Sequence, residues 1–241
     1  MSPYQPFIHQ SPRGGNMPYR LLSPANPVPG KQYPLVLFFH GAGDRGNDNL
    51  AQLKHCLWAF IEPVRRAQYP CFVLAPQCPE NKQWANYHIM NYLDVKDSPA
   101  EPSNEMCLAM EILNQVETTN ADLIDLNRIY VSGLSMGGYG TWDCLARWPE
   151  KFAAAVPICG GGDEKTISAK AAQIPLWAFH SSDDPWVDVS GSRTMVSALR
   201  RAGGNPRYTE YDCYGHECWE PAYADPELFP WLFSQCRTQR G

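Results

Sequence analysis

The hydrophobic residues of this chain fall into short, nearly continuous runs that are separated by segments with helical spacing. The runs at residues 34–39, 71–76 and 153–158 contain almost no polar side chain. Such runs are typical of strands that are buried on both faces of a sheet. With similar segments elsewhere, they predict strands at 34–39, 71–76, 128–132, 153–158, 174–180 and 207–211.

Helical patterns lie between these predicted strands. At residues 105–117 the apolar positions recur every three to four residues and share one face. Further helices are expected over the earlier part of 57–64, where Pro63 ends the helix, and at 137–148, 190–202 and 228–236. The alternation predicts an α/β protein with a mostly parallel central sheet and helices on both faces. Residues 4–10 and 17–24 are expected to add two antiparallel edge strands.

Composition and charge narrow the class of protein. With 241 residues, 44% of them hydrophobic, the chain can bury a sizeable core and is expected to form a single domain over residues 1–241. The net charge of −5 argues against nucleic acid as a partner. No apolar run approaches the roughly 18 residues that span a membrane. The sequence does not predict an oligomeric state.

The start of the chain and its cysteines bear on the compartment. Residues 1–15 lack the charged start and apolar middle of a signal peptide, which leaves a cytoplasmic protein or a domain of a larger, secreted one. Most of the nine cysteines stand singly in apolar segments, as buried thiols often do. Only Cys71 with Cys78 and Cys213 with Cys218 lie close in sequence, and disulfides are left open.

A serine flanked by glycines follows the predicted strand at 128–132. Residues 133–137 read Gly-Leu-Ser-Met-Gly and fit the pattern G-x-S-x-G, with a predicted helix directly after them. Between a strand and a helix, this pattern is typical of a sharp, strained turn that lifts the serine hydroxyl above the sheet. The alternative is an ordinary turn in which Ser135 caps the helix. The residues that follow favour Ser135 as a nucleophile.

A nucleophilic serine needs a base, and the base needs an orienting acid. In this arrangement the order along the chain is serine, acid, histidine. His216 lies in a polar loop after the last predicted strand and is the expected base. His180 precedes every good acid candidate, so we expect it to pack or hydrogen-bond locally.

The acid is expected in the loop HSSDDPWVDV, which follows the predicted strand at 174–180. Asp183, Asp184 and Asp188 compete for this role. Asp184 is favoured because Pro185 directly after it fixes the backbone, and Asp183 is the runner-up.

Acyl transfer also needs hydrogen-bond donors for the oxyanion. One is expected to be the amide of Met136, the residue after the nucleophile. The other is expected in the loop FFHGAGDRG, where Ala42 is the most suitable donor because Gly41 and Gly43 let its amide face the site. This chemistry requires no metal and no organic cofactor.

Three rival interpretations use some of the same residues. Residues 41–46 match the dinucleotide-binding pattern G-x-G-x-x-G, but the next strand ends at residues 75–77 without the expected acidic residue. Cys213, His216 and Cys218 have the spacing of metal ligands, yet no second ligand pair completes a zinc site. A binding module that has lost catalysis would lack a member of the serine, acid and histidine set, which is complete here.

The segments HGAGDRGNDN, APQCP, DLNRIYVSGLSMGGYGTW, FAAAVPICGGGD, HSSDDPWV and GHECWEPAY resemble, in this order, those of α/β-hydrolase serine esterases. The chain is similar to bacterial carboxylesterases that are often described as predicted peptidases. It is also similar to feruloyl and acetyl-xylan esterases of the polyhydroxybutyrate-depolymerase type. The resemblance runs from about residue 17 to the predicted C-terminal helix.

The resemblance implies an α/β-hydrolase fold and the same site residues: Ser135 as nucleophile, Asp184 as acid, His216 as base, and Ala42 and Met136 as oxyanion donors. Two departures lie beside the acid. Ser181 stands where the family commonly has glycine, and Asp188 where a proline is common.

The expected reaction is hydrolysis of a small ester through an acyl-enzyme, with short acyl groups favoured because no apolar lid helix is evident. Substrate contacts are expected from Trp84, Trp186 and Trp219, which we place in loops at the rim of the site. The loop at 77–103 is long enough to have a function of its own. Feruloyl or acetyl-xylan esters and, less favoured, peptide amides are the alternative substrates.

Overall fold

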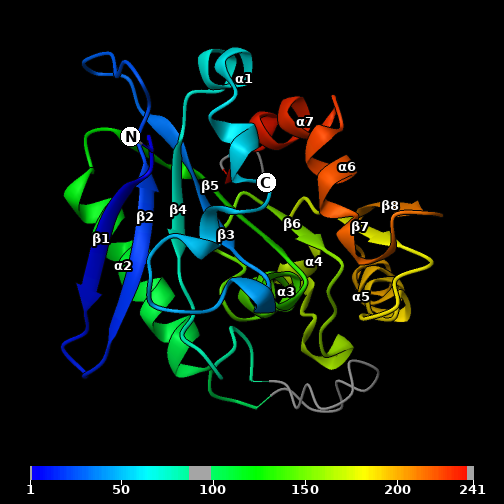
Figure 1. Ribbon diagram of the computed structural model, residues 1–241. Helices are drawn as coiled ribbons and strands as arrows, with labels where there is room; N and C mark the ends of the chain where they lie inside the picture. Colours follow the sequence, from blue (N-terminus) through cyan, green and yellow to red (C-terminus); the bar gives the residue numbers. More distant parts are fainter. Residues whose placement is uncertain (1, 87–98, 238–241) are drawn as a thin grey trace.

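The computed structural model describes residues 2–86 and 99–237, which form one eight-stranded sheet with helices on both faces (Figure 1). The strands are β1 (Gln5–Gln10), β2 (Asn16–Leu22), β3 (Tyr33–Phe39), β4 (Phe72–Pro76), β5 (Ile124–Leu134), β6 (Ala154–Ile158), β7 (Trp177–Ser181) and β8 (Arg207–Tyr211). Their order across the sheet is β1-β2-β4-β3-β5-β6-β7-β8. β1 and β2 pair antiparallel and β2 continues antiparallel to β4, whereas all pairs from β4 to β8 are parallel. The predicted fold class and its antiparallel edge are confirmed.

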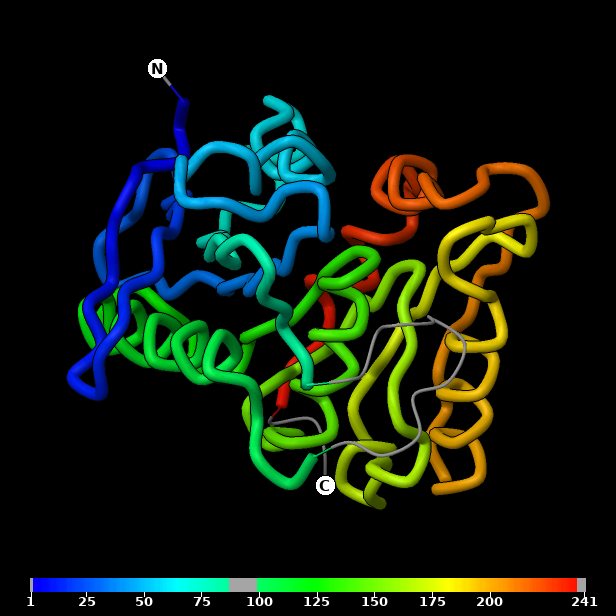
Figure 2. Tube along the Cα trace, turned by 60° about the horizontal axis from the view of Figure 1, so that its bottom comes forward, coloured from blue at the N-terminus to red at the C-terminus, as the bar shows by residue number. Residues whose placement is uncertain are grey.

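The helices are α1 (Pro63–Gln68), α2 (Asn104–Thr119), α3 (Met136–Arg147), α4 (Ala169–Ala172), α5 (Ser190–Arg201), α6 (Trp219–Ala224) and α7 (Leu228–Ser234). Short 3₁₀ turns are η1 (Ala42–Asp44), η2 (Ala51–Leu53), η3 (Leu57–Phe60), η4 (Glu164–Thr166) and η5 (Gly215–Glu217). The hairpin of β1 and β2 and the elements around β8 lie at opposite ends of the molecule (Figures 1 and 2).

The continuous apolar run of β3 supplies two hydrophobic cores at once. Because side chains alternate along a strand, Leu35 and Leu37 join the core beneath α2, α3 and α5, while Val36 and Phe38 join the core beneath α6 and α7. All seven residues of β3 are buried. The expectation of strands buried on both faces is therefore confirmed for β3.

Some predicted boundaries are wrong. Pro63 does not end a helix but begins α1, where the missing N–H of proline removes no helical hydrogen bond. The side chain of Glu62 caps this helix by accepting from the amides of Val64 and Arg65. The sequence pattern also missed α6, because this short helix lies in a segment whose polar residues resemble a loop.

The parallel strands direct four connecting loops to one edge of the sheet. The chain leaves the carboxyl ends of β3, β5, β7 and β8 and enters the segments that carry Ala42, Ser135, Asp184 and His216. This is the edge at which open α/β sheets bind ligands. All nine cysteines lie within the described residues and are free thiols. Within the same residues, no helix has both the length and the apolar character to cross a membrane.

Candidate active site

Ser135 occupies the turn between β5 and α3 in a strained backbone conformation. Its φ is 53° and its ψ is −119°, whereas non-glycine residues rarely adopt positive φ and do so at a cost of about 1–3 kcal/mol. The amide of Ser135 donates to the carbonyl of Ile158 at 2.9 Å, which fixes the turn against β6. The hydroxyl makes no capping bond to α3, so the interpretation of Ser135 as a helix cap is wrong.

The glycines around Ser135 are required by the close approach of other backbone. A Cβ atom on Gly133 would lie 2.3 Å from the carbonyl oxygen of Gly137. A Cβ atom on Gly137 would lie 2.0 Å from the carbonyl oxygen of Phe39. Since any side chain would collide with backbone at these two positions, the G-x-S-x-G pattern follows from the packing of α3 against β3.

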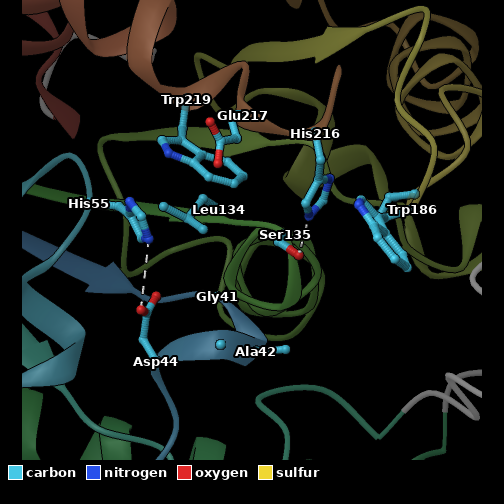
Figure 3. Close-up of a pocket in the computed structure, with 12 residues that line it drawn as sticks. Gly41, Ala42, Asp44, His55, Leu134, Ser135, Trp186, His216, Glu217 and Trp219 are labelled. Atoms are coloured by element: carbon cyan, nitrogen blue, oxygen red, sulfur yellow. Dashed lines mark hydrogen bonds and ion pairs between the residues drawn. The ribbon is translucent and has the colours of Figure 1, made fainter. Parts of the chain in front are cut away.

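His216 connects the serine to a carboxylate. Its Nε2 atom lies 2.9 Å from the hydroxyl of Ser135, and its Nδ1 atom lies 2.7 Å from Oδ2 of Asp184 (Figure 3). A carboxylate only accepts hydrogen bonds, so the Nδ1–H of a neutral His216 donates to Asp184 and Nε2 accepts from the serine. The structure thus brings together the residues predicted as nucleophile, acid and base, in the geometry that the serine mechanism needs.

The carboxylate of Asp184 is completely buried and accepts several hydrogen bonds. Oδ1 accepts from the amides of Trp186 at 2.9 Å and Val187 at 3.0 Å. Burial raises the pKa of Asp184, but the hydrogen bonds from His180, His216 and the two amides outweigh burial and hold this pKa well below its usual range. Asp184 is therefore ionised at neutral pH and can stabilise a charged His216.

The runner-up, Asp183, has a different position. Its Oδ1 accepts from the hydroxyl of Ser181 at 2.6 Å and from the amide of Gly215 at 2.9 Å. The Ser181 oxygen in turn accepts from the amide of Tyr214 at 3.1 Å. Ser181, one of the two departures from the family pattern, thus helps Asp183 to join the acid loop to the loop of His216.

The other competing residues also act locally. Asp188 accepts from the amide of Ser190 at 2.8 Å, where α5 begins. His180 is buried, as its local role predicts, with Nδ1 2.8 Å from the hydroxyl of Ser192. Its Nε2 lies 3.0 Å from the carbonyl oxygen of Val187 and 3.3 Å from Oδ2 of Asp184. The contact of His180 with the acid was not predicted, because it depends on the turn after β7 that folds Asp184 back toward His180.

The two amides predicted for the oxyanion belong to Met136, which follows the serine in sequence, and to Ala42 in the loop after β3. Met136 is the first residue of α3, whose N-terminus carries partial positive charge. Ala42 begins η1 and lines the same pocket as Ser135. Among the described residues, no hydrogen bond engages the amide of either one. Within the described residues, the N–H groups of Ala42 and Met136 are therefore available to bind an oxyanion.

The Ala42 loop is held in place by a buried histidine. The Nε2 atom of His40 accepts from the amide of Cys78 at 2.9 Å, so the proton of the neutral ring lies on Nδ1 and is donated to the carbonyl of Gly41 at 2.7 Å. Burial lowers the pKa of His40 to about 4. His40 is therefore neutral at pH 7 and ties the start of this loop to the end of β4.

A pocket of about 550 Å³ opens beside the hydroxyl of Ser135 (Figure 3). Its apolar wall includes Leu134, Val187 and the two tryptophans Trp186 and Trp219, of which Trp186 is 69% exposed. The pocket also has a polar end, which the sequence did not reveal and which is formed by the side chains Asp44, His55 and Glu217.

The polar end of the pocket is built around a buried carboxylate. His55 Nε2 lies 3.8 Å from Oδ1 of Asp44, and the His55 ring packs on Trp219 with centroids 5.2 Å apart. Burial raises the pKa of Asp44, and the neighbouring His55 and Lys54 side chains oppose this effect. The side chains at this end of the pocket can donate hydrogen bonds to a substrate and accept hydrogen bonds from it.

The sequence model of the phospholipases and carboxylesterases matches residues 27–225. The chain belongs to this α/β-hydrolase family. The structure of a thermostable esterase is similar to that of the present chain, with a TM-score of 0.86 and 40% sequence identity. The similar region covers 97% of the present chain and 63% of the thermostable esterase chain. A poly(3-hydroxybutyrate) depolymerase of Ralstonia pickettii is 25% identical over 222 residues, which are 89% of this chain and 44% of the depolymerase.

A ferulic acid esterase shares the fold, with a TM-score of 0.69 and 18% identity over 95% of this chain and 97% of the other. The present chain spans less than half of the depolymerase and about two thirds of the thermostable esterase. The family match and the thermostable esterase structure show membership of the phospholipase and carboxylesterase family and its α/β-hydrolase fold, and the ferulic acid esterase shares this fold.

In this hydrolase one predicted substrate contact is misplaced. Trp84 is completely buried and does not lie at the rim of the pocket. Its Nε1–H donates to the carbonyl of His40 at 3.1 Å, and its ring packs on Phe39 with centroids 4.8 Å apart. Trp84 instead supports the strand that leads to Ala42. The middle of the long loop at 77–103, residues 87–98, lies outside the described residues.

Two of the rival interpretations, the dinucleotide site and the zinc site, do not fit this family member. Within residues 41–46 the chain forms the short 3₁₀ turn η1 (Ala42–Asp44) in the pocket of Ser135 instead of opening a helix for a dinucleotide. Of the described residues, the one group that could hold a metal is Cys159, Asp184 and His216, without Cys213 or Cys218. Burial raises the pKa of the Cys159 thiol, and both ring nitrogens of His216 are engaged, so this group suits proton transfer better than metal binding.

Proposed function

We propose that the protein is a serine carboxylesterase that hydrolyses short-chain acyl esters through an acyl-enzyme. The observation that carries this proposal is the chain of hydrogen bonds from Ser135 through His216 to Asp184, at 2.9 and 2.7 Å. The Ser135 end of this chain lies in a pocket whose walls are apolar apart from a polar end. Membership of the phospholipase and carboxylesterase family supports the same reaction class.

In the acylation step, the Oγ atom of Ser135 attacks the carbonyl carbon of the ester while Nε2 of His216 takes the hydroxyl proton. The carbonyl oxygen becomes an anion that the amides of Ala42 and Met136 can stabilise, since neighbouring described residues do not occupy them. The tetrahedral intermediate collapses, the bond to the alcohol oxygen breaks, and His216 returns its proton to the departing alcohol.

Deacylation repeats the sequence with water as the nucleophile. His216 removes a proton from a water molecule, which attacks the acyl carbon bound to Ser135. The serine oxygen leaves with the proton from His216, so that acid and free enzyme are formed. Asp184 keeps the Nδ1–H of His216 oriented and stabilises the ring while it is charged.

The dimensions and chemistry of the pocket favour small acyl groups. Its volume of about 550 Å³ lies within the range of small-molecule sites. Trp186 and Trp219 offer aromatic surface that also suits a feruloyl ring or the face of a sugar. We therefore keep feruloyl or acetyl-xylan ester hydrolysis as the second candidate function, and cleavage of peptide amides as a less favoured third.

The proposal is tested by a rate profile over substrates. Purified enzyme is assayed with p-nitrophenyl esters of increasing acyl length, with methyl ferulate, with acetylated xylan and with a peptide p-nitroanilide. We expect the largest kcat/KM for acetyl to butyryl esters. Faster turnover of the amide than of every ester would overturn the assignment as a carboxylesterase.

A further inference from the structure

His180 is a buried histidine to which the proposed reaction gives no part. Its side chain lies on β7 and is completely buried. Its Nδ1 atom lies 2.8 Å from the hydroxyl of Ser192 in α5. Its Nε2 atom lies 3.0 Å from the carbonyl oxygen of Val187 and 3.3 Å from Oδ2 of Asp184. Because the ring is buried, these neighbours must satisfy both of its nitrogens.

The neighbours of the ring decide where its proton lies. The carbonyl oxygen of Val187 and the ionised carboxylate of Asp184 only accept hydrogen bonds, so Nε2 of His180 carries a proton and donates it. The hydroxyl of Ser192 lies 3.0 Å from the carbonyl oxygen of Gly160 as well as close to Nδ1. If this hydroxyl donates to Nδ1 the ring is neutral, and if it donates to Gly160 the ring is charged. In both states His180 donates from Nε2 toward Asp184.

His180 and His216 donate to the same oxygen of the acid. Oδ2 of Asp184 lies 2.7 Å from Nδ1 of His216 and 3.3 Å from Nε2 of His180. Burial raises the pKa of Asp184, and the hydrogen bond from His180 lowers it more than the hydrogen bond from His216 does. A hydrogen bond to the charged form of a carboxylate makes it a weaker base. While His180 donates, Asp184 therefore stabilises a charged His216 less than it would alone.

We propose that His180 is a positioning residue that acts through Asp184, and that its Nε2–H limits how strongly this carboxylate holds a proton on His216. The proposal rests on the proposed esterase function and adds the residue that sets the pH at which His216 becomes a base. Above this pH His216 is neutral and can take the proton of Ser135, and below it the ring is already protonated. Without the donor of His180, His216 should stay protonated to a higher pH.

Other titratable groups face these residues from the elements packed around them. Burial raises the pKa of the Cys159 thiol, which is therefore uncharged at neutral pH. Hydrogen bonds lower the pKa of Asp183 (from Ser181), of Asp188 (from Ser190) and of Glu210 (from Arg193, to about 2), so these carboxylates stay ionised above about pH 5. The remaining groups are Asp44 and His55 in the pocket, Glu217 in η5 and Cys218 at the start of α6. Substitutions at His180 leave all of them in place.

The test is the pH profile of kcat/KM for p-nitrophenyl acetate in the native enzyme, His180→Phe and His180→Gln. Phenylalanine keeps a planar ring without a donor, whereas the side-chain amide of glutamine can donate from near the position of Nε2. We expect the acid limb of His180→Phe to lie about one pH unit above that of the native enzyme, a ten-fold change in proton binding by the base. His180→Gln should remove most of this shift.

The matched control is His40→Phe. His40 is a second buried histidine at the end of a parallel strand, and its ring nitrogens bond to Gly41 and Cys78. This variant should lose stability but keep the native acid limb. The proposal is overturned if His180→Phe keeps the native limb or moves it to lower pH, if His180→Gln shifts as far as His180→Phe, or if His40→Phe shifts equally.

Nuclear magnetic resonance of the native protein with ¹⁵N-labelled histidine tests the donor without catalysis. One set of ring signals, identified by its absence in His180→Gln, should keep a proton on Nε2 between about pH 5 and 8. An Nε2 atom without a proton in this range would overturn the proposal, even if His180→Phe does not fold. The same spectra follow the protonation of His216, which should move to higher pH in His180→Phe.

These measurements distinguish failure of the two proposals. If the native enzyme does not hydrolyse p-nitrophenyl acetate, or if Ser135→Ala hydrolyses it equally well, the esterase proposal fails, while the spectra still decide whether His180 acts on His216. If the native enzyme hydrolyses this ester through Ser135 but neither the acid limb nor the protonation of His216 moves in folded His180→Phe, only the proposal for His180 fails.

Discussion

The Nε2 atom of His180 lies 3.3 Å from Oδ2 of Asp184, the same oxygen that His216 contacts at 2.7 Å. Two imidazole rings thus converge on one buried carboxylate oxygen, while two backbone amides donate to the other oxygen. Since a buried carboxylate is stable only when hydrogen bonds replace its water shell, this set of donors explains why Asp184 remains ionised. The acid of the proposed mechanism is therefore held in place independently of His216.

This arrangement predicts unequal effects of two neighbouring substitutions. Asp184→Asn should lower kcat for p-nitrophenyl acetate by about 10⁴-fold, because an amide can neither fix the tautomer of His216 nor stabilise its charged form. Asp183→Asn should lower kcat by no more than about ten-fold, because Asp183 bonds to Ser181 and Gly215 and helps to join two loops. Steady-state kinetics on both variants checks this. A larger loss for Asp183→Asn would show that the acid is misassigned.

The proposed oxyanion donor can be removed without a change of side-chain chemistry. Ala42→Pro deletes the amide hydrogen at the first residue of η1, a position that proline accepts. Gly41 before it has φ −77° and ψ 171°, the extended conformation that a residue before proline prefers. We expect kcat to fall by about 10²–10³-fold with little change in KM.

Ala42→Gly is the control for this experiment, since it keeps the amide and should stay within a few-fold of the native kcat. If the proline variant retains its melting temperature and also its kcat, the amide of Ala42 does not stabilise the oxyanion.

The close packing at Gly137 predicts a large loss of stability on enlargement. In Gly137→Ala the new Cβ would meet the carbonyl oxygen of Phe39 at 2.0 Å, so β3 and α3 must separate. We expect the free energy of unfolding to fall by at least about 3 kcal/mol. Gly43→Ala is the stability control because, apart from its chain neighbours, no atom lies within 4 Å of the position that the new methyl group would take. Equal urea midpoints for the two variants would contradict the account of the turn.

His40 predicts a specific loss of stability in acid. Its pKa is about 4 in the folded protein and 6.5 when it is unperturbed, because burial disfavours the charged ring. Below pH 6.5 the His40 ring therefore binds a proton in the unfolded chain. In the folded protein the ring stays neutral until the pH approaches 4. The resulting stabilisation is complete above pH 6.5 and is lost as the pH falls toward 4, by about 3 kcal/mol in total.

The measurement is the free energy of unfolding in urea at several pH values between 7 and 4. His40→Gln should be less stable than the native protein at pH 7 but should lose less stability on acidification. An equally steep loss in both proteins would assign the acid sensitivity to other groups.

Much of the fold could be predicted from the sequence because the strands β3, β4, β6 and β7 are buried along their whole length. The run at β3 is apolar throughout since alternate residues serve two cores, and such a run is easily recognised. The prediction at Pro63 is wrong because proline both ends helices and begins them, and the capping bonds of Glu62 that decide between these roles are not visible in a hydrophobicity pattern.

The residues of the proposed triad could be predicted because the nucleophile, the acid and the histidine follow a fixed order along the chain. The side chains that surround the triad could not be predicted in this way. Trp84 stands in a polar segment, which predicts a place at the rim, yet it fills the space beside Gly140, where a Cβ atom would lie 2.7 Å from the Cβ of Trp84. His55 contributes to the pocket only because η2 and η3 carry it next to Trp219. Contacts of this kind depend on tertiary packing and have no local signal.

The central claim is that Ser135 forms the acyl-enzyme, and its most direct test is covalent trapping. The native enzyme and Ser135→Ala are treated with a p-nitrophenyl phosphonate, and the site of modification is mapped by peptide mass spectrometry while esterase activity is followed. We predict one phosphonyl group per native chain, on Ser135, with loss of activity in proportion to labelling. We also predict no such label in Ser135→Ala, whose kcat should fall by at least about 10⁵-fold. Inactivation with the phosphonyl group on another residue, or undiminished ester hydrolysis by Ser135→Ala, would contradict the account.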